Sequence, residues 1–261
     1  MTQPTTSPVT SPMKPVANNQ SIKTPGAFAA LYRLVLRHQV TRGRLVLFAA
    51  VLSASLVVGW VIGQRSDDPI QFATDTVSLI GFGLVVPVVA LVLGSAALGN
   101  WVDDETLVYV WLRPVSRFTI AAAATLAAGT VAIPISIVSM AALAALGSQW
   151  DSGVILGAAV ASGLGSLAYT ALFVLGGLLT KRALLWGLVY VFIWEFFVAR
   201  AGDGAARLSI NSYASSLLSD FSGIEIRLAD RAPTTSYIVL LAVTAVAVAL
   251  SSWRLSRANV A

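Results

Sequence analysis

The chain contains no cysteine, only one histidine and few charged residues, with Asp, Glu, Lys and Arg making up 11% of its 261 positions. The absence of cysteine excludes a disulfide, an iron–sulfur cluster and a thiolate metal site. An ordinary soluble domain carries charges at about a quarter of its positions. With 57% apolar residues, the composition points away from a soluble domain and towards a membrane.

Long apolar runs account for this composition: Leu45–Gly63, Thr76–Gly99, Phe118–Gly147, Gly153–Thr180, Ala183–Ala199 and Tyr237–Trp253. About 20 helical residues cross a hydrocarbon core of about 30 Å. Only the fifth run contains a charged residue, Glu195. The sequence predicts an all-α membrane protein with six transmembrane helices. Pro134, near the middle of the long third run, predicts a kink there.

The segment before the first run divides into two parts. Residues 1–26 are rich in Thr, Ser, Pro and Asn, lack the apolar core of a signal peptide, and are expected to form a disordered cytoplasmic tail. Residues 27–44 carry an apolar stripe at spacings of three and four: Phe28, Leu31, Tyr32, Val35 and Leu36. This stripe, with arginines around it, favours an interfacial amphipathic helix over a plain extension of the first span. Residues 45–261 form the transmembrane domain.

The segment between the last two runs, residues 200–236, carries a second stripe of this kind: Ile210, Tyr213, Leu217, Leu218, Phe221 and Ile224. Asn211 and several serines fall on the other side. We expect an extracytoplasmic amphipathic helix or helical hairpin that rests on, or dips into, the outer leaflet. Tyr213 and Phe221 are candidate residues of a gate or transport pathway.

Glycines are frequent in the second run (Gly81, Gly83, Gly94 and Gly99) and in the fourth (Gly157, Gly163, Gly165, Gly176 and Gly177). Small residues allow helices to approach closely in lipid, so both runs are expected to face other helices.

The Lys and Arg residues indicate an orientation. If the N-terminus is cytoplasmic, 12 of the 17 lie in cytoplasmic segments and 5 outside. The positive-inside rule then places both termini of the six-span chain in the cytoplasm. Anionic lipid headgroups, and not nucleic acid, are the expected partner of this positive charge.

A charged loop, residues 100–117, joins the second and third runs. It opens with Asp103, Asp104 and Glu105, and closes with Arg113, Pro114 and Arg117. Acids near a helix start and basic residues near its end suit a short helix that stops before Pro114. Such a helix is suited to docking another protein, whereas the alternative is a solvated loop whose charges only set the topology.

Two motifs in this loop, Thr106-Leu107 and Pro114-Val115-Ser116-Arg117, resemble the permease subunits of type-2 ABC transporters at the spacing usual in that family. Asp103 and Asp104 stand in the family's acidic stretch, whereas Glu105 departs from its usual glycine. The predicted interfacial helix, six spans and outer helical segment extend the resemblance over nearly the whole chain.

This resemblance implies a subunit of a bacterial exporter in the plasma (inner) membrane. Cytoplasmic ABC ATPase subunits would bind the ATP and Mg²⁺, and a second permease copy, identical or related, would complete the transport path. The cargo is expected to be hydrophobic or amphipathic, because the spans are nearly free of charge. Contact with the ATPase would involve Asp103, Asp104, Glu105, Thr106, Leu107, Arg113, Pro114 and Arg117.

Catalytic motifs are missing from the chain. No Gly-Lys pair occurs, so the nucleotide-binding loop G-x-x-x-x-G-K-[ST] is absent. The single histidine, His38, lies on the predicted interfacial helix, and no His–carboxylate cluster is present to hold a metal. We therefore expect a non-catalytic subunit without a cofactor or metal of its own.

Glu195 is the one ionisable residue inside a run, where a charge costs roughly 2.5–3.5 kcal/mol at mid-bilayer. It is either a gate or pathway residue or, beside Trp194, Phe196 and Phe197, an interfacial anchor that reaches to water. Two other functions remain open. The chain could be a stand-alone proton-coupled carrier that uses Glu195, or a non-transporting membrane anchor for a soluble partner.

Overall fold

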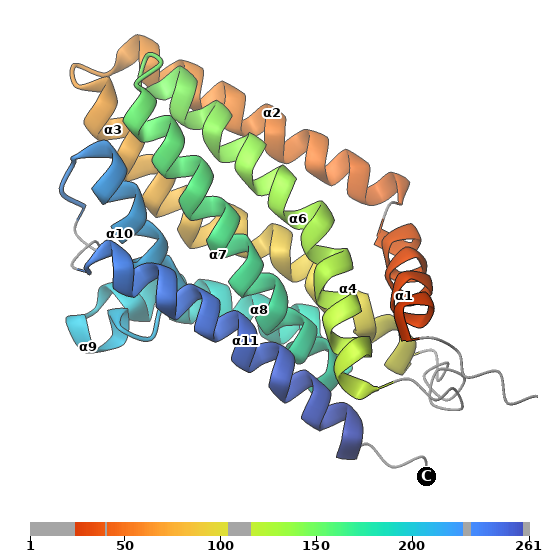
Figure 1. The fold of residues 1–261 in the computed structure, drawn as a ribbon. Helices are drawn as coiled ribbons and strands as arrows, with labels where there is room; N and C mark the ends of the chain where they lie inside the picture. The colour runs from red at the N-terminus through yellow and green to blue at the C-terminus, as the bar shows by residue number, and fades with distance from the viewer. Residues whose placement is uncertain (1–23, 40, 104–115, 227–230, 258–261) are drawn as a thin grey trace, which may run out of the picture.

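The computed structural model describes residues 24–39, 41–103, 116–226 and 231–257, and all regular elements in these ranges are helices. The helices long and apolar enough to cross a membrane are α2 (Arg42–Arg65), the stretch Pro69–Gly99, α6 (Arg117–Gly147), α7 (Ser152–Leu179) and α11 (Pro233–Arg257). They lie side by side in one bundle (Figure 1). The chain is a helical, membrane-embedded, multi-pass protein, and five of the predicted spans are confirmed as long apolar helices.

The predicted fifth span, Ala183–Ala199, differs from the other five. Its apolar helix covers Ala183–Phe197, as α8 (Ala183–Val189, 7 residues) followed by the π-helical segment η2 (Tyr190–Phe197, 8 residues). A short 3₁₀ turn, η3 (Val198–Arg200), ends it. The apolar helix rises about 22 Å, less than the roughly 30 Å of a hydrocarbon core. The prediction of six spans is therefore confirmed for five helices and not for this one.

The stretch Pro69–Gly99 and α7 form the centre of the bundle. The first consists of α3 (Pro69–Thr76), the π-helical segment η1 (Val77–Val85) and most of α4 (Val86–Asp103). In their most apolar parts, 67% and 61% of the residues are buried, against 22% in both α2 and α11. The prediction that these two spans face other helices is confirmed.

Glycine makes this central contact possible. A Cβ atom built on Gly94 would lie 2.9 Å from the carbonyl oxygen of Thr170, and one on Gly177 would lie 2.6 Å from that of Ser95. Both distances are too short for a side chain, so α4 and α7 touch backbone to backbone at these positions.

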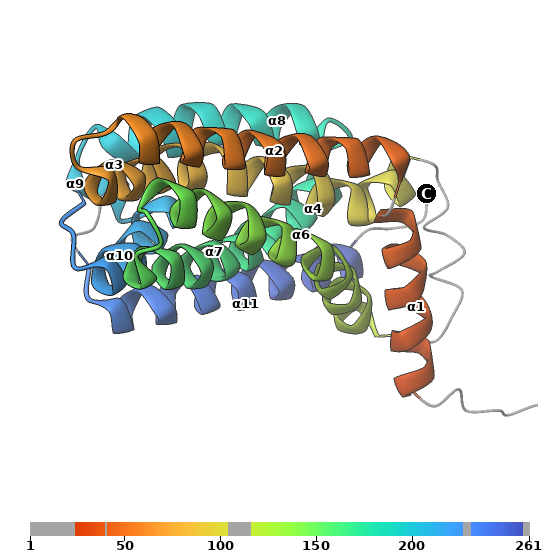
Figure 2. The same cartoon turned by 90° about the horizontal axis from the view of Figure 1, so that it is seen from above.

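Helix α6 runs without a break from Arg117 to Gly147, with Pro134 inside it. Its first turn is capped by Ser116, whose hydroxyl oxygen accepts the N–H of Thr119 at 3.1 Å. Figure 2 shows that the two halves of α6 run in different directions, as expected where proline removes a backbone hydrogen bond.

Helix α1 (Thr24–Gln39) crosses one end of the bundle at a steep angle to the other helices (Figure 2). Val35 and Gln39 are buried, and the Gln39 amide donates to the carbonyl oxygen of Leu93 at 2.9 Å. The helix ends earlier than the predicted boundary of residue 44, because Arg42 already begins α2. The structure thus has a separate helix before the first span, which begins at Thr24, three residues inside the segment predicted as a tail, and ends at Gln39.

Helix α10 (Ile210–Ser222) follows the short α9 (Asp203–Ala206) and packs against α7, α11 and η1. Ser209 caps its start, and Gly223, with φ at 68°, ends it in the left-handed conformation that glycine favours. Nine consecutive residues, 210–218, are buried. The predicted helix exists, but its polar face is not directed to water or headgroups, because α10 lies inside the bundle.

The two ends of the bundle differ in charge. The end that α1 crosses, hereafter the basic end, carries Arg33, Arg37, Arg42, Arg44, Arg117, Lys181, Arg182, Arg254 and Arg257. The opposite end holds the α2–α3 and α6–α7 connections and α10 (Figure 1). Six described acidic residues lie there, with three arginines: Asp67, Asp68, Asp75, Asp151, Asp220 and Glu225, and Arg65, Arg207 and Arg231.

Candidate functional site: a buried carboxylate at the start of helix α10

Glu195, near the end of η2, is completely buried and directed at the start of α10. Its Oε1 atom accepts the Tyr190 hydroxyl at 2.8 Å and the N–H of Ile210 at 3.2 Å. Its Oε2 atom accepts the Ser209 hydroxyl at 2.5 Å and the N–H of Asn211 at 3.3 Å. Each carboxylate oxygen therefore has two donors.

This arrangement explains how a carboxylate is tolerated inside the bundle. The first N–H groups of a helix have no partner within the helix, and together they carry a partial positive charge. Glu195 accepts two of them and adds two hydroxyl donors. A buried charge that is hydrogen-bonded on both oxygens avoids most of the cost of an unpaired one.

The burial of Glu195 bears on the interfacial anchor, one of the two interpretations offered by its sequence context. Its side chain is 0% exposed and does not reach water, as such an anchor would. The carboxylate instead joins two segments 14 residues apart, η2 and the start of α10. It is a buried residue that fixes the position of α10.

Two residues of this site, Tyr190 and Ser209, are not among the predicted site residues, and Asn211 is predicted only as part of the polar side of its helix. Ser209 has a recognisable signal, because serine directly before an apolar stripe is a common helix cap. Tyr190 has none, since its contact with Glu195 depends on the π-helical path of the chain between them.

A second polar connection holds α10 from the side of η1. The hydroxyls of Ser78 and Ser215 share a hydrogen bond of 2.7 Å, and Ser215 also donates to Oδ1 of Asn211 at 3.1 Å. Ser78 and Glu195 belong to the two π-helical segments, η1 and η2, which contact each other. Segments of this kind are rare and often mark functional sites.

The other two candidate gate residues lie at different depths on α10. Tyr213 is buried one turn from Glu195, donates its hydroxyl to the carbonyl oxygen of Arg207 at 2.8 Å, and lies 5.9 Å below the Arg231 guanidinium. Phe221 is 38% exposed near the other end of the helix, beside Gly157 of α7. Glu195 contacts the first residues of α10, and Phe221 lies about 16 Å from Ile210 along the helix.

The predicted coupling residues fall mostly on a segment outside the described ranges: Asp104, Glu105, Thr106, Leu107, Arg113 and Pro114. The backbone on both sides is described. Asp103 is the last residue of α4, and Arg117 is the first residue of α6. The segment therefore starts and ends at the basic end of the bundle (Figure 1).

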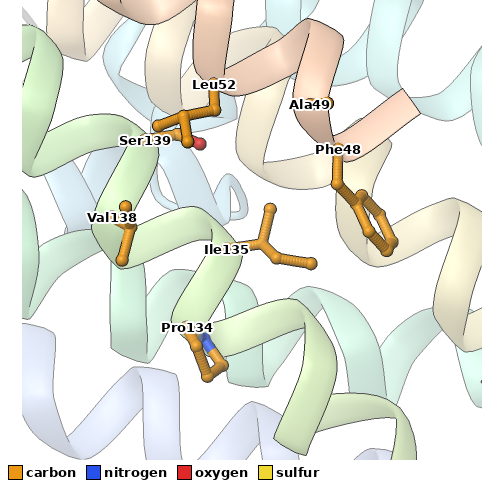
Figure 3. A pocket seen from close by; sticks show the side chains of 7 residues that line it. All are labelled: Phe48, Ala49, Leu52, Pro134, Ile135, Val138 and Ser139. Carbon is orange, nitrogen blue, oxygen red and sulfur yellow. The ribbon is translucent and has the colours of Figure 1, made fainter. Parts of the chain in front are cut away.

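A groove between α2 and α6 is a further feature, with a volume of about 280 Å³ (Figure 3). Its lining is apolar except for one hydroxyl: Phe48, Ala49, Leu52, Pro134, Ile135, Val138 and Ser139. The Ser139 hydroxyl is buried and has no hydrogen-bond partner among the described residues. Ser55 and Ser251, by contrast, donate to the carbonyl four residues earlier.

In the part of the chain that the structure describes, no three His, Cys, Asp or Glu side chains come together as a metal site would require. No protein-family model and no curated protein matches the chain. The likeness of the loop 100–117 to ABC permeases therefore rests on its motifs alone.

Proposed function

We propose that the chain is the permease subunit of an ATP-driven ABC exporter, with six spans and both termini in the cytoplasm of a bacterium. The observation that carries the proposal is the loop 100–117, whose Thr106-Leu107 and Pro114–Arg117 motifs resemble the ATPase-contacting loop of type-2 permeases. A separate ATPase subunit would dock on this loop. A second permease copy would complete the path.

The position of the loop supports this assignment. Its two ends, at α4 and α6, lie at the basic end of the bundle together with α1. Basic residues gather on the cytoplasmic side of membrane proteins. A loop at this end is accessible to a cytoplasmic ATPase, and α1 lies across the same end as an interfacial helix would.

The opposite end would hold the outer gate. Helix α10, fixed by Glu195, packs among α7, α11 and η1 there, so movement of these helices would change its contacts. The apolar groove between α2 and α6 and the nearly charge-free spans suit a hydrophobic or amphipathic cargo.

Of the other functions, a proton-coupled carrier is less well supported. The four hydrogen bonds of the Glu195 carboxylate come from protein groups that connect η2 to the start of α10, so both of its oxygens are occupied within the fold. If Glu195 were the proton site, Glu195→Gln would abolish gradient-driven transport, and loss of the ATPase would have no effect. A non-transporting anchor predicts a bound partner without stimulated ATP hydrolysis.

The direct test is affinity purification of the tagged chain in detergent, with identification of co-purifying proteins and measurement of their ATPase rate. One variant changes Asp103, Asp104 and Glu105 to Lys. A matched control makes the same change at Asp67, Asp220 and Glu225, three acids of the opposite end that are exposed. An ATPase retained by the wild type and the control, and lost from the loop variant, is the expected result. Wild type that purifies without an ATPase under conditions that preserve complexes would contradict the proposal.

A further inference from the structure

A cavity of about 240 Å³ lies at the basic end, where the start of α2 meets α4 and the α7–α8 turn. Its lining includes two cationic side chains, Arg44 and Lys181, and the hydroxyl residues Ser95 and Thr180. These come from three separate parts of the chain, so the cavity is formed by the fold and not by one helix.

Arg44 is fixed in place by its own neighbours. Its Nη1 atom donates to Oε1 of Gln39 at 2.7 Å and to the carbonyl oxygen of His38 at 2.9 Å. The other N–H groups of the guanidinium bond to no described residue. An arginine held in this way keeps donors for an incoming anion, and its planar shape suits phosphate.

Two further donors face the same space. The Thr180 oxygen accepts the N–H of Arg182 at 3.2 Å, so its own proton remains available. The Lys181 ammonium is exposed and makes no hydrogen bond or ion pair within the described ranges.

No described carboxylate balances these two positive charges. The acidic side chains that the structure describes lie at the opposite end of the bundle, apart from Glu195, whose oxygens are already occupied. Two cations and a hydroxyl around one cavity therefore complement an anion.

The surroundings of the cavity indicate which anion. Val92 and Leu184 are part of the lining, and beside them Leu185 and Trp186 of α8 are 54% and 60% exposed. Exposed apolar side chains on a membrane helix lie against acyl chains. A ligand with a phosphate and an apolar tail would satisfy both parts of this site.

We propose that the cavity binds the phosphate of an anionic phospholipid, with Arg44, Lys181 and Thr180 as donors and the acyl chains along α8. Basic pockets between helices at a membrane surface suit such headgroups. This proposal does not depend on the permease assignment.

The test uses the full chain, delipidated in detergent and titrated with phosphatidylglycerol or phosphatidylcholine, with bound lipid counted by native mass spectrometry. The site variant combines Arg44→Gln and Lys181→Gln. The matched control combines Arg42→Gln and Arg182→Gln, which remove two adjacent, exposed charges outside the cavity lining. We expect phosphatidylglycerol affinity to fall about tenfold or more in the site variant, since it removes both cationic donors from the cavity lining. The control variant should keep nearly all of the wild-type affinity for phosphatidylglycerol.

Lys181→Gln and Thr180→Val are tested singly, because Arg44 also supports the α1–α2 junction and its loss could affect folding. Each should weaken phosphatidylglycerol binding by a smaller factor with phosphatidylcholine binding unchanged. Equal affinity in the site variant and the wild type, or equal losses in the site variant and the control, would overturn the proposal. Displacement of the lipid by inorganic phosphate at equal concentration would show a soluble-anion site instead. Stronger lipid binding after neutralisation of Asp103, Asp104 and Glu105 would identify the chain's own acids as the occupant.

Discussion

Helices α1 and α10 share an amphipathic pattern but occupy opposite positions in the molecule. Helix α1 crosses the basic end with its arginines exposed and buries few side chains, among them Val35 and Gln39. Helix α10 lies within the bundle and buries nine consecutive residues. The same spacing of apolar residues has therefore produced a helix on the surface and a helix inside.

The difference lies in the polar side of each helix. Arg33 and Arg37 of α1 carry charges that need water or headgroups. In the buried part of α10 the polar residues are serine and asparagine, and Ser215, Ser216 and the Oδ1 atom of Asn211 bond to Ser78, to each other or to the helix backbone. The Nδ2 atom of Asn211 has no partner among the described residues, and the one acid of the helix, Asp220, is exposed near its end. Small neutral polar groups can form their hydrogen bonds inside a protein. A buried charge instead needs several donors or an opposite charge, as Glu195 has at the start of α10.

The largest effect is expected for the carboxylate that holds α10. Glu195→Leu would leave two hydroxyls and two N–H groups buried without an acceptor, at a cost of about 3–5 kcal/mol in the free energy of unfolding. Glu195→Gln should cost less, because its amide oxygen still accepts. Thermal unfolding in detergent measures the stability of both Glu195 variants, and Glu225→Gln, which changes an exposed acid, is the control. Equal stability of Glu195→Leu and wild type would show that α10 is held by apolar contacts alone.

A smaller loss is expected where α10 touches α7. A Cβ atom on Gly157 would lie 3.0 Å from side-chain atoms of Leu218 and Phe221. Gly157→Val should therefore push α10 outwards and lower the free energy of unfolding by about 1–3 kcal/mol. Gly176→Val, in the same helix, meets no atom within 4 Å and serves as control. Increased protease cleavage near α10 in Gly157→Val, and not in Gly176→Val, would confirm that α10 has been displaced. Similar cleavage in both variants would contradict this explanation.

A modest effect is expected at the contact of α1 with α6. Tyr32→Phe removes the exposed hydrogen bond of 2.9 Å between the hydroxyls of Tyr32 and Thr130. This loss should lower the free energy of unfolding by about 0.5–1 kcal/mol. Tyr237→Phe is the matched control, since the Tyr237 hydroxyl bonds no described residue. Faster hydrogen exchange in α1 of the Tyr32 variant, and not of the control, is the readout.

The smallest effect on stability is expected for the arginines of α1. Replacement of Arg33 and Arg37 by Gln should change the free energy of unfolding by less than about 0.5 kcal/mol, because both are exposed. A peptide of residues 24–39 should nevertheless bind anionic vesicles more weakly after the change, with the difference shrinking as salt is raised. Salt-independent binding would show that apolar contacts alone hold α1 at a membrane.

The sequence predicts the long helices well, because charge-free runs of this length have few other stable arrangements. The predicted boundaries Leu45–Gly63 and Gly153–Thr180 differ from α2 and α7 by a few residues at most. The sequence predicts less about the fifth run. Its length and apolarity do not reveal that Tyr190–Phe197 is π-helical or that Glu195 faces inwards.

The position of α10 could not be predicted for a related reason. The stripe Ile210–Ile224 shows that one side of the helix is apolar, but not whether the other side meets water or protein. That depends on Ser78, 137 residues from its partner Ser215, and on Glu195. Partners so distant are not visible in local spacing.

The hydrogen bonds of Glu195 also have a consequence for biosynthesis. Three of its four donors, from Ser209 to Asn211, are translated at least 14 residues after it, a delay of roughly 1–3 s at ribosomal speed. During that interval a charged side chain in an apolar segment lacks most of its partners, which disfavours stable entry of the segment into lipid. We therefore expect residues 183–211 to become stable as one unit, against η1 and α7, which precede them in the chain.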